Sequence, residues 1–348
     1  MGHTLASDLE YIVRSCEGLW ETLRNRRLLI TGGTGFFGSW ILESFAWANN
    51  KFDLSASAAV LTRNPEAFRK KMPHLASEPN IGIYKGDVRT FDLLVEPFDF
   101  IIHAAAPVDP KVLARDRLET VDTIVNGTRQ ILQHSIRCKA QRLLYISSGA
   151  VYGAQPTELQ GLSEHYNGAP DITKPSWAYG EAKRYAEMLC TLFHESYGVP
   201  VVIARPFTFV GPYQDLDASF AVTQFIRCGL RGVPIRIEGD GTPLRSYCYA
   251  ADLAVALWKI LLEGKPGSVY NVGSEEVLSI LELAHRVVMA LGIDLDIFVS
   301  RQAAIDTKPV RYVPDITRLK SELGFRPQVE LDVALKKTIN WARETHKM

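Results

Sequence analysis

The sequence lacks the features that mark membrane-spanning and nucleic-acid-binding proteins. It contains no stretch of about 20 apolar residues, so no helix is expected to cross a membrane. Its first residues, Met1-Gly2-His3, do not begin a secretion signal. Neither sign of charge is in excess, because 39 lysines and arginines balance 39 aspartates and glutamates. Without a net field, we expect no binding to nucleic acid or to an anionic membrane.

Cysteine is also scarce, with five among 348 residues. The five stand at positions 16, 138, 190, 228 and 248, and none lies in a CxxC pair or at metal-ligand spacing. This scatter argues against a disulfide framework and against a structural zinc site. We therefore predict free thiols in a reducing cytoplasm and no bound metal.

What the sequence does contain is a long alternation of apolar runs and helical stretches. Hydrophobic residues make up 47% of the chain and charged residues 22%, so the protein can bury a large core. Most candidate strands are continuous apolar runs, as expected for a parallel sheet covered by helices on both faces. They span 27–31, 57–62, 81–85, 99–104, 142–147 and 200–204. We predict an α/β fold with a Rossmann-type, doubly wound parallel sheet.

A glycine-rich turn follows the first candidate strand. Gly32, Gly35 and Gly38 are spaced as GxxGxxG, and an apolar helical segment, 40–48, comes directly after them. Glycine permits a tight turn and a close approach of the backbone, while the start of a helix offers unpaired N–H groups and a positive dipole. The arrangement predicts a site for the pyrophosphate of a dinucleotide.

The chain divides into three predicted regions. Residues 1–25 form a helical extension that packs outside the core, and residues 26–205 form the dinucleotide-binding domain. After residue 205 the pattern changes to helical stretches with short strands near 234–237 and 269–272. The expected helices are 219–231, 278–291, 315–323 and 331–345. We predict that 206–348 is mainly a smaller substrate-binding α/β region, interleaved with the main sheet.

A second motif combines Ser148 with Tyr179 and Lys183. Of the 13 tyrosines, only Tyr179 has a lysine four residues later, which places the two side chains one helical turn apart. A tyrosine with a pKa near 10 is a poor base at neutral pH. A neighbouring ammonium would lower that pKa, so Tyr179 could exchange a proton with a substrate oxygen. Ser148, at the end of a strand, would hydrogen-bond the same oxygen while a nicotinamide transfers the hydride.

Several motifs, in this order, resemble those of extended short-chain dehydrogenases/reductases. They are TGGTGFFG at 31–38, HAAA at 103–106, SSGAVYG at 147–153 and YGEAK at 179–183. Two further segments, 239–249 and 270–273, resemble the nucleotide-sugar epimerase/dehydratase branch. The resemblance covers about residues 26 to 345. It implies a Rossmann domain, a nucleoside-diphosphate sugar as substrate and a homodimer built on a pair of helices.

The end of the second strand bears on the choice of cofactor. NAD-binding proteins place an acid there for the ribose 2′-OH, but this chain has Thr62 and Arg63 instead. Arg63 could pair with the 2′-phosphate, so we favour NADP and keep NAD as the alternative. Asp87 resembles the family's adenine-contacting acid, although it could equally cap a loop. The residues predicted to contact the cofactor are Gly32, Thr34, Gly35, Phe36, Phe37, Gly38, Thr62, Arg63, Asp87, Val88, Ala104, Ala105, Ala106, Tyr179, Lys183 and Pro206.

The substrate site is predicted from the same resemblance. Arg245 resembles the arginine that holds the substrate diphosphate, with a structural salt bridge as the alternative. Thr208 and Gln224 stand where relatives often have asparagine. The residues predicted to contact the substrate are Ser148, Gly149, Tyr152, Thr208, Gln224, Arg245 and Arg311. His103 and Asn126 are interpreted as structural.

Two residues after Ser148 decide between reactions. Relatives that eliminate water usually have an acid pair there, and decarboxylating relatives a glutamate nearby, but this chain has Gly149 and Ala150. An epimerase or a 4-ketoreductase acting at C4 of the sugar needs no such acid, so we expect one of these. The alternatives are a 4,6-dehydratase or decarboxylase with a displaced acid such as Glu164 or Asp171, and a non-catalytic, NADP-sensing regulator.

Overall fold

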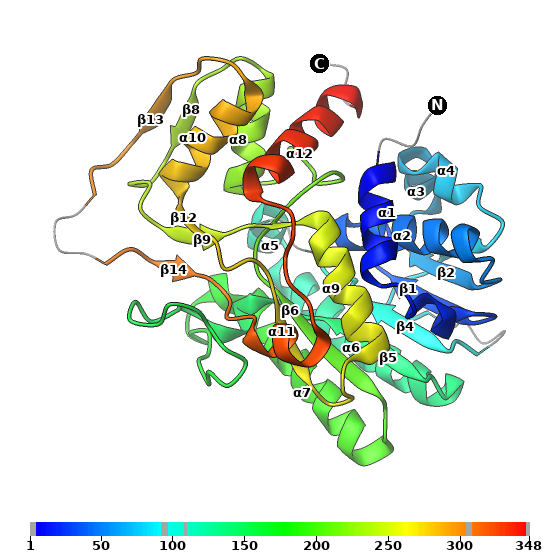
Figure 1. Ribbon diagram of the computed structural model, residues 1–348. Coiled ribbons are helices and arrows are strands. Elements are labelled where there is room, and N and C mark those ends of the chain that lie inside the picture. Colours follow the sequence, from blue (N-terminus) through cyan, green and yellow to red (C-terminus); the bar gives the residue numbers. More distant parts are fainter. Residues whose placement is uncertain (1–4, 92–96, 108–109, 304–307, 346–348) are drawn as a thin grey trace.

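The centre of the protein is a seven-stranded parallel sheet. The computed structural model describes residues 5–91, 97–107, 110–303 and 308–345 (Figure 1). The strands are ordered β11-β6-β5-β4-β1-β2-β3, and every neighbouring pair is parallel. Their bounds are β1 (Arg27–Thr31), β2 (Ser57–Thr62), β3 (Ile81–Lys85), β4 (Phe100–His103), β5 (Arg142–Ile146), β6 (Val201–Pro206) and β11 (Val269–Val272). The predicted α/β fold with a doubly wound sheet is confirmed.

Helices cover both faces of this sheet. Leu28 and Ile30 of β1 pack into one buried cluster, and Leu29 between them packs into a second cluster on the opposite face. Helices α2 (Phe36–Phe52) and α9 (Ala250–Glu263) contribute to the first cluster. Helices α6 (Arg117–Cys138) and α7 (Ala178–Tyr197) lie against each other and cover the second. This burial on both sides explains why the strands are continuous apolar runs.

The strand order reverses between β1 and β4, the place where ligands bind in folds of this kind. Here the chain approaches itself closely, since a Cβ atom placed on Gly32 would lie 2.6 Å from the carbonyl carbon of Ala104. Gly32 also has a φ of +71°, a left-handed conformation that favours glycine. The first glycine of the motif is thus required by space and by conformation.

The N-terminal helix α1 (Ala6–Ser15) forms an outer layer on α2 and α9, followed by the short helix η1 (Trp20–Leu23). Its Tyr11 hydroxyl donates to Asp252 at 2.5 Å, and its Asp8 accepts from the Tyr249 hydroxyl at 2.8 Å. These hydrogen bonds attach the N-terminal extension to helix α9 and to the residue before it, 241 positions later in the sequence.

The C-terminal part of the chain contributes to two bodies of structure. Helices α8 (Ala221–Leu230), α10 (Ile280–Leu291) and α12 (Leu331–Thr345) pack together at one end of the molecule (Figure 1). Strand β11 and helix α9 instead belong to the layers of the main sheet. The predicted domain boundaries stay a prediction.

Smaller elements complete the fold. A three-stranded sheet is ordered β12-β9-β14, and two-stranded sheets pair β10 with β7 and β13 with β8. The remaining bounds are α3 (Pro65–Lys71), α4 (Pro73–Ala76), α5 (Pro110–Arg115), η2 (Gly149–Tyr152), η3 (Pro175–Trp177), β7 (Phe209–Val210), β8 (Ile235–Ile237), β9 (Leu244–Ser246), β10 (Cys248–Tyr249), β12 (Val277–Ser279), β13 (Ile297–Val299), β14 (Arg311–Tyr312) and α11 (Thr317–Leu323). All five cysteines are unpaired thiols. Within the described ranges, no helix has the length and apolarity needed to cross a membrane.

Candidate active site

The glycine-rich turn joins β1 to the start of α2. Gly35 caps the helix with no side-chain hydrogen bond, so the N–H groups of the first turn have no partner within the helix. A Cβ atom on Gly38 would lie 2.4 Å from the carbonyl oxygen of Gly32, which shows that the turn has no room for a side chain there. The free N–H groups and the bare backbone fit the pyrophosphate of a dinucleotide.

Basic side chains gather beyond the end of β2. Thr62 is buried, and its hydroxyl oxygen accepts a hydrogen bond from the Asn64 N–H at 3.2 Å. Arg63 is exposed and lines a pocket of about 580 Å³ together with Arg69 and Lys85. The only acid among the residues lining this pocket is Glu66, which pairs with Arg69 at 2.6 Å. In the part of the chain that the structure describes, no ion pair is formed by Arg63, and its charge helps Arg89 to lower the pKa of Asp87.

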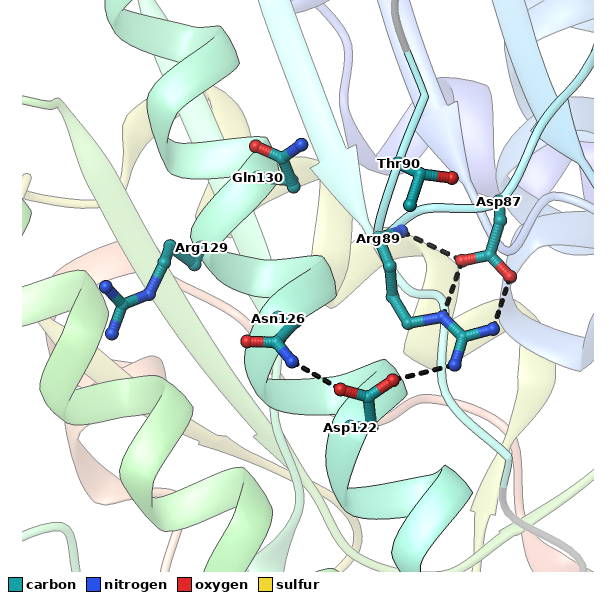
Figure 2. Close-up of a pocket in the computed structure, with 7 residues that line it drawn as sticks. All are labelled: Asp87, Arg89, Thr90, Asp122, Asn126, Arg129 and Gln130. Atoms are coloured by element: carbon teal, nitrogen blue, oxygen red, sulfur yellow. Dashed lines mark hydrogen bonds and ion pairs between the residues drawn. The ribbon is translucent and has the colours of Figure 1, made fainter.

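A second pocket, of about 520 Å³, lies beside the end of β3 (Figure 2). Arg89, which lines this pocket, pairs with two acids. It donates from Nη2 to Asp87 at 2.8 Å and from Nη1 to Asp122 at 2.7 Å. Arg89 lowers the pKa of Asp87 to about 2. Asn126, interpreted from the sequence as structural, donates to Asp122. The acid predicted to contact adenine thus has an arginine partner within the chain, and its contact with adenine stays a prediction.

Ser148, Tyr179 and Lys183 are brought together at the end of β5. Ser148 caps η2 by accepting from the Ala150 N–H at 3.1 Å. Tyr179 and Lys183 lie one turn apart on α7, and the Lys183 ammonium donates to the Ile146 carbonyl at 2.7 Å. The Ser148 hydroxyl lowers the pKa of Tyr179, against a larger rise caused by burial.

The protonation states differ from the sequence-based expectation. Burial raises the pKa of Tyr179 to about 12 and lowers the pKa of Lys183 to about 7. The expected lowering of the Tyr179 pKa by the ammonium is therefore not seen in the protein alone. The physical reason is that desolvation disfavours the charged form of both groups. This effect on the two pKa values is larger than the opposite effect of the neighbouring groups. Tyr179 is consequently a neutral phenol in the protein alone.

A buried network supports α7 behind these residues, and sequence reasoning missed it. Arg205 donates from Nε to Glu187 at 2.9 Å and from Nη1 to the Tyr152 hydroxyl at 2.8 Å. Tyr152 in turn donates to Asn271 at 2.8 Å. The negative charge of Glu187 raises the pKa of Lys183 against the effect of burial. Tyr152 is only 1% exposed, so the structure uses its hydroxyl within the protein and its predicted contact with the sugar stays untested.

The predicted diphosphate-binding residue, Arg245, lies on β9 beside β14. Its guanidinium donates to the Leu244 carbonyl at 2.8 Å and lies 5.8 Å from the centre of the Tyr312 ring. Burial lowers its pKa, and no carboxylate of the described ranges forms an ion pair with it. A partly buried cation without a counter-ion suits an anionic ligand better than it suits a structural salt bridge.

The other predicted substrate residues are placed as follows. Pro206 is buried at the end of β6, and the Thr208 hydroxyl oxygen is buried without a hydrogen-bond partner among the described residues. Gln224 is half-buried on α8. Arg311 lies beside the loop at 155–162, where it donates to the Gln160 carbonyl at 3.4 Å. In the register of β14 with β9, Arg311 stands opposite Leu244, next to Arg245, and its predicted contact with the substrate stays a prediction.

The two acids that could replace a missing catalytic acid lie in other surroundings. Glu164 accepts from the Asn271 N–H at 2.7 Å. Asp171 is exposed, caps Thr173 and pairs with Lys174 at 3.1 Å. His103 is packed as predicted, because it is 2% exposed and its Nδ1 contacts the Thr31 hydroxyl at 2.7 Å.

Ala104, Ala105, Ala106 and Val88 form the wall near the turn. The three alanines are half-buried at the end of β4, and the Ala105 N–H donates to the Thr31 hydroxyl at 3.3 Å. Val88 is buried, and a Cβ atom on Gly127 of α6 would lie 2.7 Å from it. Thr34 in the turn is half-buried, as are Phe36 and Phe37 at the start of α2. Small residues therefore line the edge of the sheet where the dinucleotide is expected.

Comparisons with known proteins agree with this geometry. The model of the NAD dependent epimerase/dehydratase family matches residues 28–273. The chain is 32% identical over 307 residues to UDP-glucuronic acid decarboxylase 6 of Arabidopsis thaliana, covering 88% of this chain and 86% of that protein. It superposes on the dTDP-glucose 4,6-dehydratase DesIV of Streptomyces venezuelae, solved with NAD, with a TM-score of 0.79 and 27% identity over 92% of this chain and 98% of that one. It shares the fold of the Thermotoga maritima UDP-glucose 4-epimerase, with a TM-score of 0.79 and 23% identity over 92% and 99% of the two chains.

Proposed function

The chain belongs to the NAD-dependent epimerase/dehydratase family, within the extended short-chain dehydrogenases/reductases, and we propose that it modifies a nucleotide sugar by hydride transfer at C4. The reaction would be that of an epimerase or a 4-ketoreductase. The observation that carries this proposal is the meeting of Ser148, Tyr179 and Lys183 at one point without a carboxylate in either position after Ser148.

Each of the three residues has a distinct task in this proposal. Ser148 would hydrogen-bond the oxygen on C4, and Tyr179 would exchange a proton with the same oxygen. When bound, the nicotinamide supplies or accepts the hydride at C4. Because burial keeps Tyr179 protonated, its hydroxyl is ready to donate as a C4 ketone is reduced to an alcohol. Lys183, fixed to the Ile146 carbonyl, would hold the turn of α7 that presents Tyr179.

Decarboxylation is the second candidate, because several curated relatives near 32% identity are named as UDP-glucuronic acid decarboxylases. The position of the acids speaks against it. Gly149 and Ala150 carry no acid, Glu164 accepts a backbone N–H of β11, and Asp171 is exposed at a turn. The same facts speak against 4,6-dehydration. A non-catalytic regulator would have no need of Ser148, Tyr179 and Lys183 near the end of one strand.

For the cofactor we propose NADP, with NAD as the alternative. The support is the basic pocket of Arg63, Arg69 and Lys85 beyond β2, where a 2′-phosphate would extend from the adenine ribose. NAD is kept because DesIV was solved with NAD. The substrate diphosphate would be held by Arg245, whose guanidinium has no carboxylate partner in the described parts of the chain.

We also propose that two copies of the chain associate through α7. Tyr185, Met188 and Leu192 lie on one face of this helix by their spacing of three and four residues, and each is about half exposed. Three large apolar side chains on one exposed helical face are typical of an interface.

For the compartment we propose the cytoplasm. The five unpaired thiols suit its reducing conditions.

Mass spectrometry with a panel of nucleotide sugars tests the proposal. The purified protein, supplied with NADPH and separately with NAD, is incubated with UDP- and dTDP-linked sugars and their 4-keto derivatives. A gain of two hydrogens indicates ketone reduction, and an unchanged mass with a new retention time indicates epimerisation. Loss of water or of carbon dioxide would overturn the proposal in favour of dehydration or decarboxylation.

A further inference from the structure

We propose that Tyr312 is a second tyrosine of the active site, whose hydroxyl contacts the sugar beside C4 and helps to decide which sugar reacts. The inference rests on the proposed function, because it assigns a residue to the same substrate site. Ser148 lies near both tyrosines: a Cβ atom on Gly149, the next residue, would be 2.6 Å from the Tyr312 hydroxyl, and the Ser148 hydroxyl lowers the pKa of Tyr179 on α7 and of Tyr312 on β14 against a larger rise from burial. The two tyrosines belong to elements far apart in the sequence and meet at the one serine.

The backbone aims Tyr312 at this point. Strand β14 pairs in parallel with β9, and Tyr312 stands opposite Arg245 in the register. Successive side chains of a strand point to opposite faces. Arg311 accordingly reaches the Gln160 carbonyl, while the hydroxyl of Tyr312 lies against Gly149, the residue after Ser148.

The ring of Tyr312 is held on two sides before any substrate arrives. Its centre lies 4.7 Å from that of Phe207, and the Arg245 guanidinium carbon lies 5.8 Å from it. Phe207 is itself packed against Tyr152, at 6.1 Å, which is fixed by its hydrogen bonds to Arg205 and Asn271. A ring fixed in this way loses little conformational entropy when its hydroxyl binds a ligand.

The hydroxyl end of Tyr312 lies directly against the backbone after Ser148. A Cβ atom placed on Gly149 would be 2.6 Å from the Tyr312 hydroxyl oxygen and 2.8 Å from a ring carbon of Phe207. Any side chain at residue 149 would therefore displace both aromatic rings. Tyr312 thus fills the space that a side chain at residue 149 would need. This explains why residue 149 is a glycine and not an acid.

The position also fits the length of a hexose. Arg245 would hold the diphosphate on C1, while Ser148 and Tyr179 would hold the oxygen on C4. The Tyr312 ring lies beside Arg245, and its hydroxyl lies beside Gly149, the residue after Ser148, so a sugar that joins these two points passes along it. The half-buried phenol of Tyr312 is neutral, since partial burial raises its pKa, and it both donates and accepts hydrogen bonds. Such a group suits a hydroxyl or carbonyl next to C4.

The test compares Tyr312→Phe with the wild-type enzyme, because phenylalanine keeps the ring contacts and removes only the hydroxyl. Calorimetry with NADP-loaded protein measures the affinity for UDP or dTDP, whichever the wild type binds, and steady-state assays measure kcat and KM for its nucleotide sugar. We expect unchanged affinity for the nucleoside diphosphate and about a tenfold loss of kcat/KM for the sugar, the effect of one lost hydrogen bond. Deoxy analogues at C2, C3 and C6 extend the test. For the analogue that lacks the contacted oxygen, wild type and variant should react alike.

Tyr166→Phe serves as the matched control, since Tyr166 belongs to the same aromatic cluster, 6.2 Å from Tyr152, and should leave kcat/KM unchanged. The assignment of Tyr312 to the sugar is wrong if Tyr312→Phe reacts like the wild type. It is also wrong if the variant loses affinity for the nucleoside diphosphate to the same extent as it loses kcat/KM for the nucleotide sugar. A wild type that binds no nucleotide sugar of the panel overturns the proposed function and this inference with it. The wild-type result and the comparison of variants thus separate the two failures.

Discussion

The Lys183 ammonium donates a hydrogen bond to the carbonyl oxygen of Ile146, 2.7 Å away. This bond joins the first half of α7 to the last residue of β5, two residues before Ser148. Tyr179, one turn before Lys183, is thereby held over the serine. Since Lys183 is only 3% exposed, the bond is formed in a dry environment, where losing it is costly.

We expect Tyr179→Phe to abolish turnover while leaving cofactor affinity within about twofold of wild type. The hydroxyl is the proton donor in the proposed reaction, and a positioned acid or base contributes about 10²–10⁴-fold to rate. Turnover is measured with the nucleotide sugar found in the panel, and cofactor affinity by fluorescence titration. The control is Tyr197→Phe, at the exposed end of the same helix. Undiminished turnover in Tyr179→Phe would contradict the assignment of the proton donor.

Lys183 should make the stability of the cofactor-free protein depend on pH. Burial lowers its pKa to about 7, whereas in the unfolded chain it stays near 10.5. Between these values the unfolded state binds the proton and the folded state does not, so the unfolding free energy rises with pH, by up to about 1.4 kcal/mol per unit. Below pH 7 both states are charged and the slope vanishes.

Urea unfolding of wild type and Lys183→Met at pH 6, 7, 8 and 9 isolates this contribution, because methionine fills similar space without a titrating group. The difference between the two proteins should change from pH 7 upward in favour of the wild type. A difference that stays constant over this range would show that Lys183 keeps its ordinary pKa in the folded protein.

Arg63→Ala should weaken NADP binding about tenfold and leave NAD binding unchanged. The predicted contact is a charge-assisted hydrogen bond to the 2′-phosphate, which NAD lacks. Calorimetry with both cofactors measures the effect. Lys70→Ala, an exposed cation one residue from Arg69 but outside the residues that line the pocket, controls for general charge. Equal losses of affinity for NADP and NAD would mean that Arg63 does not contact the 2′-phosphate.

The local parts of the site could be predicted from the sequence. Gly32, Gly35 and Gly38 stand within one turn between a strand and a helix, and Tyr179 and Lys183 within one helical turn, so spacing alone places them. The six apolar runs were likewise predicted within one or two residues of β1 to β6. Such features depend on short-range geometry, which the pattern of residues expresses directly.

Parts that depend on contacts between distant segments escaped prediction. Tyr312 lies against Gly149 only because β14 pairs with β9, and strands of two and three residues have no periodicity to detect. The buried pair of Glu187 and Arg205 joins a helix to a strand. Helix α9 was missed for another reason: its residues are apolar nearly all round, so no stripe marks it as a helix.

Gly149→Ala should destabilise the protein by about 1–3 kcal/mol and reduce turnover. The added methyl would lie 2.6 Å from the Tyr312 hydroxyl, and forcing atoms into a packed space costs this much. The control is Gly239→Ala, where no atom lies within 4 Å of the new Cβ. Its unfolding free energy should equal that of the wild type. If Gly149→Ala is as stable and active as wild type, the closeness of Tyr312 to residue 149 is wrong.

Met188→Glu should convert the proposed dimer to a monomer. Met188 is 54% exposed in the single chain and lies between Tyr185 and Leu192 on the apolar face of α7. A second copy seated on this face would bury the new carboxylate without a partner, which costs several kcal/mol per subunit. Light scattering coupled to size-exclusion chromatography measures the mass. Met289→Glu, at a 75% exposed position on α10, should keep the wild-type mass. A wild type that elutes as a monomer would show that the proposed dimer does not form, and a Met188→Glu variant that stays dimeric would place the interface elsewhere.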